Sequence, residues 1–332
     1  MMNAQYWKAA QDGKVNCCLC PHNCSIGPGH TGVCRVRVNK EGTLIAANYG
    51  RVSSMAMDPV EKKPLYHFYP GRDIFSIGTV GCNLRCSYCQ NYTISQQEAP
   101  TRLLSPDQAV QLVLNQGPNC IGIAFTYNEP FMWYEYVLAT AKKARAAGVK
   151  TVMVTNGFVR DEPLQELLQF IDAMNIDLKA FSESTYRKLC GGSLQPVLDT
   201  VEAAVRFGCH VEATTLIIPT YNDSAAEIES LSKWLANLSP QIPLHLSRYF
   251  PQYKLSLPPT PLKTLEQAFN IARASLNYVY IGNADLGLGR NTCCPCCGAT
   301  LIKRQGYSVR LIGLKEGGSC ANCGFTLTLV TD

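Results

Sequence analysis

The chain has 332 residues, 46% of them hydrophobic, and a formal net charge of +5. This length fits about two domains or one α/β barrel, and the modest charge argues against a dedicated nucleic-acid-binding protein. No apolar run reaches the length of a membrane span, and the first residues contain no apolar signal segment. The sequence therefore predicts a cytoplasmic protein with no membrane or nucleic-acid partner.

Seventeen cysteines are the unusual feature of the composition. They concentrate in residues 17–34, 82–89 and 293–323. Because the cytosol keeps thiols reduced, clusters of cysteines predict metal ligands rather than disulfides. The predicted domains are a Cys-rich metal-binding segment over residues 1–50, a partial barrel over residues 51–285 and a zinc-ribbon or rubredoxin-like module over residues 286–332.

From residue 73 onward, short β-branched runs alternate with helical stretches. Helix 105–117 has a clear start, with Ser105 as N-cap, Pro106 at the first position and Gln108 completing a capping box. The alternation predicts an α/β fold with a parallel sheet, open or curled into a partial (β/α)6-type barrel. The predicted strands are 73–80, 120–127, 150–157, 173–181, 210–219, 242–250 and 278–283. The other predicted helices are 131–148, 161–170, 182–189, 194–207, 225–238 and 261–276.

Polar side chains follow six of the predicted strands. In parallel sheets with helical crossovers, chemistry lies beyond the C-terminal ends of the strands. We therefore expect these side chains to surround one site, with ordinary loop polarity as the alternative. They are Cys82, Thr126, Tyr127, Asn128, Glu129, Thr155, Asn156, Gly157, Asp177, Lys179, Ser247, Arg248 and Asn283.

Residues 79–91, TVGCNLRCSYCQN, carry Cys82, Cys86 and Cys89 in C-x3-C-x2-C spacing. Each iron of a [4Fe–4S] cluster is normally capped by a thiolate, so three protein ligands leave one iron open. Catalytic zinc sites likewise keep an open position. The amino and carboxylate groups of S-adenosylmethionine (SAM) can chelate such an iron and bring a cleavable sulfonium with them. A zinc loop is the alternative interpretation.

The spacing, with Tyr88 before the last cysteine and a strand before the loop, resembles the signature of the radical SAM enzymes. The resemblance implies that Cys82, Cys86 and Cys89 are catalytic ligands of a [4Fe–4S] cluster. It also implies that the reduced cluster cleaves SAM and that a 5′-deoxyadenosyl radical then abstracts hydrogen from a substrate. A flavodoxin- or ferredoxin-type electron donor is the implied partner.

Three further motifs extend the resemblance. TYNEP (126–130) resembles the second-strand motif, which implies that Glu129 meets the methionine amino group. VTNG (154–157) resembles the third-strand motif that contacts methionine or ribose. NIDLKAF (175–181) resembles an element of pyruvate formate-lyase activating enzymes, where a lysine beside the SAM carboxylate is physically sensible. The cofactor-binding residues implied in this way are Tyr88, Asn128, Glu129, Thr155, Asn156, Asp177 and Lys179.

Longer segments such as CCLCPHNCSIGPGHTGVCRVR and PLHLSRYFPQYKL resemble one subfamily over nearly the whole chain. This subfamily is the radical SAM member of the AmmeMemoRadiSam system, which implies Memo-type and AMMECR-type partner proteins. The substrate does not follow from the resemblance. Two alternatives remain: an activase that makes a glycyl radical on a partner protein, and a non-catalytic iron–sulfur and zinc interaction scaffold, against which the intact cysteine triplet argues.

The C-terminal cysteines fall into two knuckles, CCPCCG and CANCG. Cys294, Cys297, Cys320 and Cys323 fit the pattern of a zinc-ribbon or rubredoxin-like site. Cys293 and Cys296 lie at the wrong phase for this pattern. We expect a structural Zn²⁺ ion, with iron as the alternative.

The N-terminal cysteines form a less regular set. Cys17, Cys20, Cys24 and Cys34 lie within eighteen residues, with Cys18 adjacent, in a spacing typical of neither pattern. Four sulfurs so close in sequence predict a metal site. Zn²⁺ and a second iron–sulfur cluster remain equal alternatives, and free thiols are the other interpretation.

A few other residues carry weaker expectations. Cys190 at a helix end is expected to pack, with hydrogen-atom transfer as the alternative. His67 and His245 are expected to be structural, although either would also suit a site near the cluster. Arg248 at a strand end suits an anionic substrate group. Residues 61–63, EKK, are expected to form a solvated loop.

Overall fold

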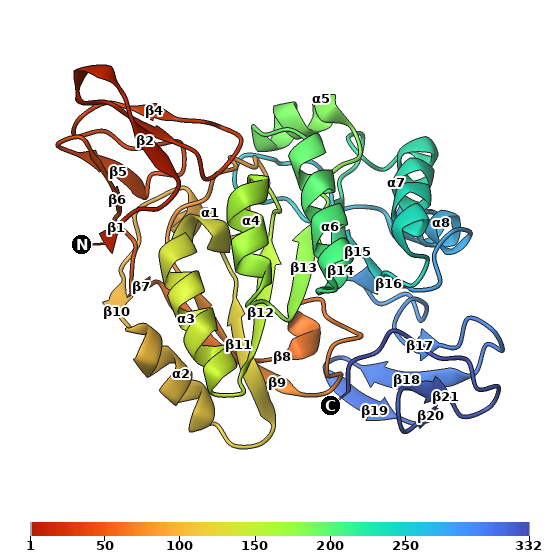
Figure 1. The fold of residues 1–332 in the computed structure, drawn as a ribbon. Coiled ribbons are helices and arrows are strands. Elements are labelled where there is room, and N and C mark those ends of the chain that lie inside the picture. The colour runs from red at the N-terminus through yellow and green to blue at the C-terminus, as the bar shows by residue number, and fades with distance from the viewer. Residues whose placement is uncertain (1, 332) are drawn as a thin grey trace.

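The computed structural model describes residues 2–331, and its centre is an eight-stranded sheet in the order β16-β15-β14-β13-β12-β11-β9-β8 (Figure 1). Every neighbouring pair from β9 to β16 is parallel, whereas β8 (Ser54–Pro59) pairs antiparallel with β9 at the edge. This arrangement confirms the predicted α/β fold. The parallel strands are β9 (Asp73–Gly78), β11 (Cys120–Phe125), β12 (Lys150–Thr155), β13 (Ala173–Asp177), β14 (His210–Ile217), β15 (Leu244–Arg248) and β16 (Val279–Gly282).

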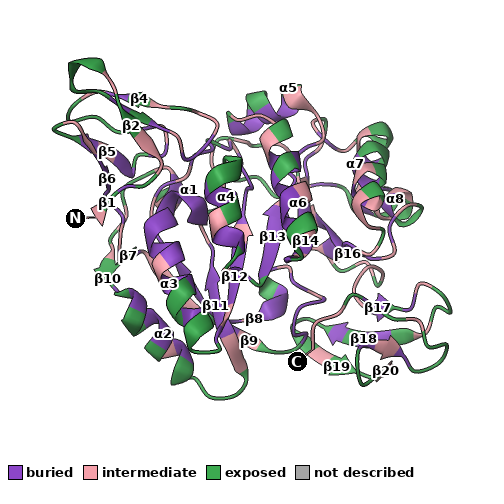
Figure 2. Cartoon of the chain, in the orientation of Figure 1, coloured by how far each residue is buried: buried purple, intermediate pink, exposed green. Residues whose placement is uncertain are grey.

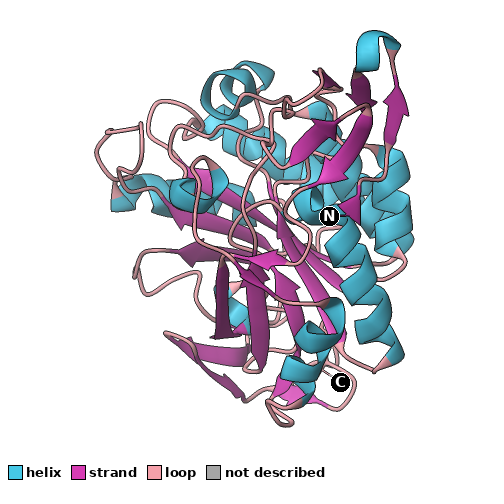
Figure 3. Cartoon of the chain, turned by 90° about the vertical axis from the view of Figure 1, so that its left-hand side faces the viewer, coloured by secondary structure: helices cyan, strands magenta, loops and turns pink. Residues whose placement is uncertain are grey.

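Helical crossovers join consecutive parallel strands, and the helices cover one side of the sheet (Figures 1 and 3). The predicted capping box at α2 is present: the Gln108 backbone N–H donates to the Ser105 hydroxyl over 3.2 Å, and the Ser105 N–H donates to the Gln108 side chain over 2.8 Å. The helices are α1 (Tyr92–Ser95), α2 (Pro106–Leu114), α3 (Tyr134–Ala146), α4 (Asp161–Leu168), α5 (Glu183–Thr185), α6 (Gln195–Phe207), α7 (Ala225–Leu238) and α8 (Leu262–Arg273).

One predicted helix has a different form. Residues 182–189 fold as the single turn α5 followed by a π-helical turn, η4 (Tyr186–Cys190). The turn lies against the cysteine loop, because the Arg85 N–H donates to the Cys190 carbonyl over 2.7 Å and the Ser87 N–H donates to the Leu189 carbonyl over 2.9 Å. A π-helical turn is a recurrent feature of functional sites. Here it accepts two backbone hydrogen bonds from the cysteine loop.

The central strands are buried on both faces, as Figure 2 shows in purple. In β11, Ile123, Ala124 and Phe125 are fully buried, and in β12 so are Val152 and Met153. A parallel strand covered on both sides requires a continuous apolar run rather than an alternating one. The sheet therefore provides a rigid support for the polar residues at its C-terminal edge.

The N-terminal residues form two small antiparallel sheets beside α3 (Figure 1). The Arg37 guanidinium donates to both carboxylate oxygens of Glu135 on α3, over 2.7 and 3.1 Å, and both side chains are almost fully buried. This ion pair fixes the segment to the body. The strands are β1 (Met2–Asn3), β5 (Arg37–Lys40) and β6 (Thr43–Ala46) in one sheet, and β2 (Trp7–Ala9), β3 (Val15–Cys17) and β4 (Ser25–Ile26) in the other.

The C-terminal residues form a separate small module that packs on β16. Tyr280 of that strand and Tyr278, just before it, share an apolar cluster with Leu301 and Ile302 of the module. The buried Arg304 also donates to the Tyr66 carbonyl oxygen over 2.7 Å. The module consists of β17 (Thr292–Cys293), β18 (Thr300–Gln305) and β19 (Ser308–Leu311), with β20 (Leu314–Lys315) paired to β21 (Ser319–Cys320).

Both histidines with an expected structural role are buried in polar contacts away from the cysteine loop. His67 Nε2 lies 2.7 Å from the Tyr280 hydroxyl. His245 Nε2 lies 2.6 Å from Glu212. These contacts support the structural interpretation of His67 and His245. Across residues 2–331, no helix has the length and apolar character needed to span a membrane.

Candidate active site

A cavity of about 480 Å³ opens at the C-terminal edge of the sheet. All three cysteines of the C-x3-C-x2-C loop line it, and so do all seven residues predicted to bind the cofactor. Polar residues from separate strands therefore meet at one place, as the sequence predicts. The volume lies in the range of pockets that hold small molecules and cofactors.

The side chain of Asn128 holds the backbone just before the cysteines of the loop. Asn128 donates its amide to the Gly81 carbonyl over 2.7 Å, and its carbonyl oxygen accepts the Thr79 N–H over 3.0 Å. The Cys82 sulfur accepts the Leu84 N–H over 3.4 Å. Asn128 thus braces the loop that presents the cysteines, in addition to lining the cavity.

Glu129 is a buried carboxylate held by three donors. The Thr155 hydroxyl donates to it over 2.6 Å, and the backbone N–H groups of Asn156 and Phe131 donate over 2.8 and 3.0 Å. Burial raises its pKa to about 7, and the three donors oppose the rise. A buried carboxylate of this kind is well suited to a cationic partner, because desolvation strengthens the attraction.

Asp177 and Lys179 form a second charged pair in the cavity wall. Lys179 Nζ lies 2.9 Å from the Asp177 carboxylate at the end of β13. Burial opposes the charge on Lys179, but the neighbouring Asp177 holds its pKa well above the usual value. The pair offers a donor and an acceptor to a polar ligand.

Two further residues predicted to bind the cofactor, Asn156 and Tyr88, contact cysteine side chains. The Asn156 amide donates to Asn83 over 2.9 Å and lies 3.6 Å from the Cys82 sulfur. The Tyr88 hydroxyl lies 3.4 Å from the sulfur of Cys190. Cys190 itself is only 1% exposed and does not line the cavity, which supports the packing interpretation.

The expectation that residues 61–63 form a solvated loop is wrong. Glu61 and Lys63 are buried, and Lys62 and Lys63 line the cavity. Asp58 accepts from Lys62 over 2.8 Å and from Lys63 over 2.7 Å. The strand β8 causes the difference, because it carries Asp58 along the edge of the sheet and brings the next turn to the cavity.

These lysines are functional candidates that sequence reasoning missed. The Tyr127 hydroxyl also donates to Asp58 over 2.7 Å. Although burial opposes ionisation, the lysines and this hydroxyl hold the pKa of Asp58 well below its usual value. The stretch MDPVEKKP has no periodicity, so the only sequence signal was two adjacent cations beside an acidic residue.

Arg248 does not take the place expected for it. Its Nε donates to the Thr260 carbonyl over 2.8 Å, and the side chain lies outside the cavity lining. Ser247 and Asn283 do line the cavity, and the Asn283 amide donates to the Ser247 hydroxyl over 2.9 Å. The ends of β15 and β16 therefore contribute neutral polar groups rather than a cation.

Comparison with known families matches this arrangement. The model of the radical SAM superfamily fits residues 76–235, which include the end of β9, the cysteine loop and strands β11 to β14. The chain belongs to the radical SAM superfamily. Membership implies a [4Fe–4S] cluster and SAM, and the cavity with three cysteines and a buried carboxylate suits both.

Two relatives show how far the similarity extends. The chain is 43% identical over 337 residues to Uncharacterized protein MJ0808 of Methanocaldococcus jannaschii, covering 99% of this chain and all of that protein. It is 25% identical over 162 residues to pyruvate formate-lyase-activating enzyme of Clostridium pasteurianum, covering 48% of this chain and 67% of that one. The likeness to activating enzymes is therefore confined to about half of the chain.

A solved structure supports the fold. A radical SAM methyltransferase from Sphaerobacter thermophilus gives a TM-score of 0.52 at 18% identity, covering 70% of this chain and 71% of that one. At this level of identity the likeness concerns the fold alone. It agrees with the parallel sheet and helical crossovers described above.

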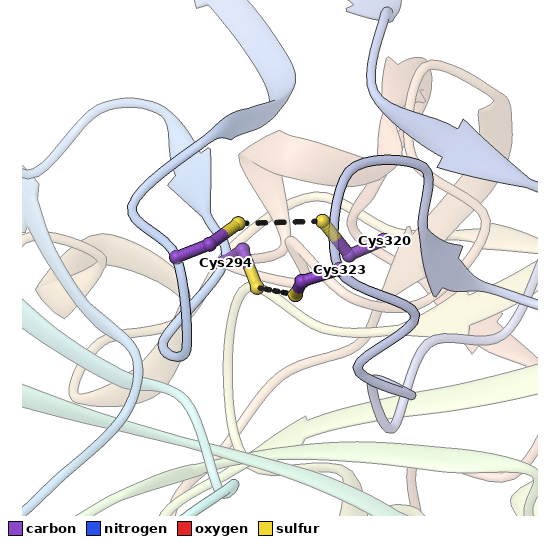
Figure 4. A group of neighbouring side chains, drawn as sticks. Cys294, Cys320 and Cys323 are labelled. Carbon is purple, nitrogen blue, oxygen red and sulfur yellow. Dashed lines mark hydrogen bonds between the residues drawn. The ribbon is translucent and has the colours of Figure 1, made fainter.

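The C-terminal knuckles form a compact four-sulfur group. Cys294 and Cys323 sulfurs lie 3.5 Å apart, and Cys297 and Cys320 sulfurs lie 3.7 Å apart. Figure 4 shows Cys294, Cys320 and Cys323 directed toward one another from two loops. All four sulfurs lie within 4.8 Å of one another, so the group can hold a metal ion. Cys293 and Cys296 are exposed and outside the group, as their phase predicts.

The N-terminal set also converges. Cys17, Cys20, Cys24 and Cys34 line one small enclosed cavity together with Arg37. Cys18 is not part of this lining, and its sulfur lies 3.6 Å from the Asn16 carbonyl oxygen. The structure therefore brings together the four cysteines that the sequence grouped.

Proposed function

We propose that the protein holds a [4Fe–4S] cluster on Cys82, Cys86 and Cys89 and uses it to cleave SAM reductively. The observation that carries this proposal is the shared cavity, which is lined by the three cysteines and by the buried Glu129. A bound cluster supplies one electron to the C5′–S bond of SAM, which yields methionine and a 5′-deoxyadenosyl radical that abstracts hydrogen from a substrate.

The residues of the chain act by holding SAM. Glu129 attracts the ammonium group of the methionine moiety, and the Thr155 hydroxyl and Asn156 N–H fix the carboxylate in place. Lys179 and Asp177 bind polar groups at the other wall, and Tyr88 and Asn128 support the loop. Glu129 and Lys179 thus have groups of opposite charge on SAM as counterparts, and such charge-assisted hydrogen bonds are stronger than neutral ones.

The test is SAM turnover by anaerobically reconstituted protein with dithionite, followed by mass spectrometry of 5′-deoxyadenosine. We expect product from the wild type and only background from Cys86→Ala. Cys120→Ser is the matched control, because Cys120 begins β11 at the end remote from Glu129. A wild-type protein with a spectroscopically verified cluster and no product contradicts the proposal.

A second candidate is a glycyl-radical activase acting on a partner protein. Its support is the similarity over about half of the chain to pyruvate formate-lyase-activating enzyme and to a putative glycyl-radical enzyme activating enzyme of Methanocaldococcus jannaschii, which is 29% identical over 171 residues. In this role the hydrogen atom comes from a backbone glycine of the partner. An organic-radical signal on a co-incubated partner protein, measured by electron paramagnetic resonance, would distinguish it.

The wider assignment follows from the sequence motifs. We place the protein in the AmmeMemoRadiSam subfamily, with Memo-type and AMMECR-type proteins as partners and a flavodoxin- or ferredoxin-type electron donor. None of the seventeen cysteines forms a disulfide, which suits the reducing cytoplasm. Co-purification of tagged Memo-type protein with this chain, with a variant lacking residues 286–332 beside it, tests the partner and the role of the proposed C-terminal domain.

The C-terminal module is proposed to bind structural Zn²⁺. A zinc ion bound to four thiolates at about 2.3 Å keeps the sulfurs about 3.8 Å apart. Two sulfur pairs of the group, at 3.5 and 3.7 Å, fit that spacing. Tetrahedral sites of four cysteines are closed, so this ion has a structural rather than a catalytic role.

A further inference from the structure

The N-terminal cysteine cavity differs from the C-terminal knuckles in its sulfur spacing. Among residues 2–331, Cys294, Cys297, Cys320 and Cys323 are the one group of metal-binding side chains whose ligand atoms all lie within 4.8 Å of one another. The N-terminal set surrounds a common cavity without reaching that spacing, and so does the Cys82 triplet. The N-terminal set therefore resembles the cluster-binding loop rather than the zinc-type site.

Sulfur spacing separates the two kinds of metal centre. One zinc ion draws four thiolates to about 3.8 Å from one another. In an iron–sulfur cluster each thiolate binds a different iron, so the thiolates stand farther apart. Soft thiolate sets select either zinc or iron–sulfur clusters, and the wider spacing here favours the cluster.

The surroundings of the four sulfurs are those of metal-bound thiolates. The Val33 N–H donates to the Cys24 sulfur over 3.5 Å. Backbone N–H groups two residues onward also face the other three sulfurs: Leu19 for Cys17, His22 for Cys20 and Val36 for Cys34. Hydrogen bonds to the sulfurs and exclusion of solvent are what a protein uses to tune the potential of a cluster.

A buried cation points to a negatively charged occupant. Arg37 lines the cavity, is 1% exposed, and its Nε has no hydrogen-bond partner. Glu135 already balances one charge by accepting from the other two guanidinium nitrogens. A buried donor without an acceptor costs about 1–3 kcal/mol, and a cluster with four thiolates would supply the acceptor.

The N-terminal cysteine cavity adjoins the cysteine loop of Cys82, Cys86 and Cys89. The Cys34 carbonyl oxygen is 2.6 Å from the point where a Cβ on Gly81 would sit, and Gly81 precedes Cys82. A second connection runs from Cys20 through His22, whose Nε2 lies 2.7 Å from the Asn83 carbonyl oxygen. The two sets of cysteines are therefore joined by packed backbone on both sides of Cys82.

We propose that Cys17, Cys20, Cys24 and Cys34 hold a second [4Fe–4S] cluster that relays electrons to the cluster on Cys82, Cys86 and Cys89. A low-potential one-electron donor reduces the N-terminal cluster by one electron. That electron passes to the SAM-binding cluster, and one electron is consumed for each SAM cleaved. The metal assignment stands by itself, whereas the relay role rests on the proposed function.

The first experiment counts metals in the full-length Cys82→Ala, Cys86→Ala, Cys89→Ala triple variant, reconstituted anaerobically. We expect about four irons and four sulfides per chain, together with one zinc. The reduced variant should also give the electron paramagnetic resonance signal of a [4Fe–4S] cluster. Two zinc ions and no iron would overturn the assignment, and this result does not depend on any SAM cleavage.

A matched pair of serine variants guards against misfolding in the triple variant. Cys24 is half-buried and lines the cavity, whereas Cys18, which is also half-buried, does not. Iron in Cys24→Ser should fall by about four per chain relative to wild type, and Cys18→Ser should match wild type. Equal iron in both variants would overturn the assignment.

The relay is tested by changing the electron donor. With reduced flavodoxin, 5′-deoxyadenosine formation by Cys24→Ser should fall at least tenfold. Single turnover by protein whose SAM-binding cluster has been reduced beforehand should be unchanged. Equal rates with flavodoxin would overturn the relay, whereas absence of product from wild type would instead contradict the proposed SAM cleavage and leave the metal counts standing.

Discussion

The Cys34 carbonyl oxygen lies 2.6 Å from the position that a Cβ on Gly81 would occupy. Gly81 also has φ near +88°, in the left-handed region. Its N–H donates to the Ile94 carbonyl, and its own carbonyl accepts from Asn128. The residue before the first cluster ligand therefore fits only as glycine, and it joins the N-terminal segment to the catalytic loop.

Gly81→Ala should displace this loop. The substitution adds a clash with backbone to the strain of a positive φ, so we expect destabilisation by about 2–4 kcal/mol and loss of iron from the Cys82 triplet. Gly117→Ala is the control, because Gly117 has φ near +83° and nothing within 4 Å of its Cβ position. Urea unfolding and iron content measure the difference; equal effects of the two substitutions would show that the Cys34 contact is unimportant.

Glu129→Gln should weaken SAM binding without removing the cluster. All three groups that contact the carboxylate are hydrogen-bond donors. The substitution removes the negative charge and also places the glutamine NH₂ group against one of these donors. A hydrogen bond to a charged group is worth about 1.5–3 kcal/mol, which corresponds to a loss of roughly 10- to 150-fold in affinity. Equilibrium dialysis with labelled SAM measures it, with the exposed Glu162→Gln as control. Unchanged affinity at equal iron content would remove Glu129 from the binding site.

The sequence was most informative where local chemistry decides structure. Parallel strands such as β11 appear as apolar runs because both faces are buried, and Ser105 and Gln108 cap α2 through contacts three residues apart. Cysteine spacing likewise grouped the knuckles of Cys294 and Cys320, because a tight four-sulfur site needs two short turns. These features depend on neighbours in sequence or on simple periodicity.

The rest depends on tertiary contacts. Lys63 looks like a solvated cation, yet it is buried because Asp58 and Tyr127 come together beside it. Arg248 looks like a substrate ligand, yet the Thr260 carbonyl takes its donor. Sequence periodicity does not predict such partners. They come together only when strands and loops distant in sequence pack in the folded protein.

Cys297→Ser should remove one zinc ion per chain. The substitution leaves three sulfurs in a site that requires four. The module that packs on Tyr278 and Tyr280 should then loosen, and the melting temperature should fall by several degrees. The exposed Cys296→Ser is the control, since Cys296 lies outside the four-sulfur group. Metal analysis and thermal unfolding measure both effects, and equal zinc in the two variants would refute the proposed ligand set.

His67 should make the protein sensitive to mild acid. Burial lowers its pKa from 6.5 to about 3, with the nearby Glu212 opposing and Arg304 adding to the shift. Between these values the unfolded chain binds a proton that the folded chain does not, so stability is present above pH 6.5 and falls as the pH drops toward 3. From pH 7.5 to 5.5 the expected contribution of His67 is about 1.4 kcal/mol.

The measurement compares urea unfolding at these two pH values in wild type and His67→Gln at equal metal content. The variant should lose about 1.4 kcal/mol less than wild type over the interval, because glutamine does not titrate. Burial opposes ionisation of Glu212, but its hydrogen bonds with His210 and His245 lower its pKa from 4.5. Glu212 therefore adds to the loss of stability in acid only below pH 4.5. His30→Gln at an exposed histidine is the control and should follow wild type. A variant that loses as much stability as wild type would show that His67 takes up its proton without unfolding.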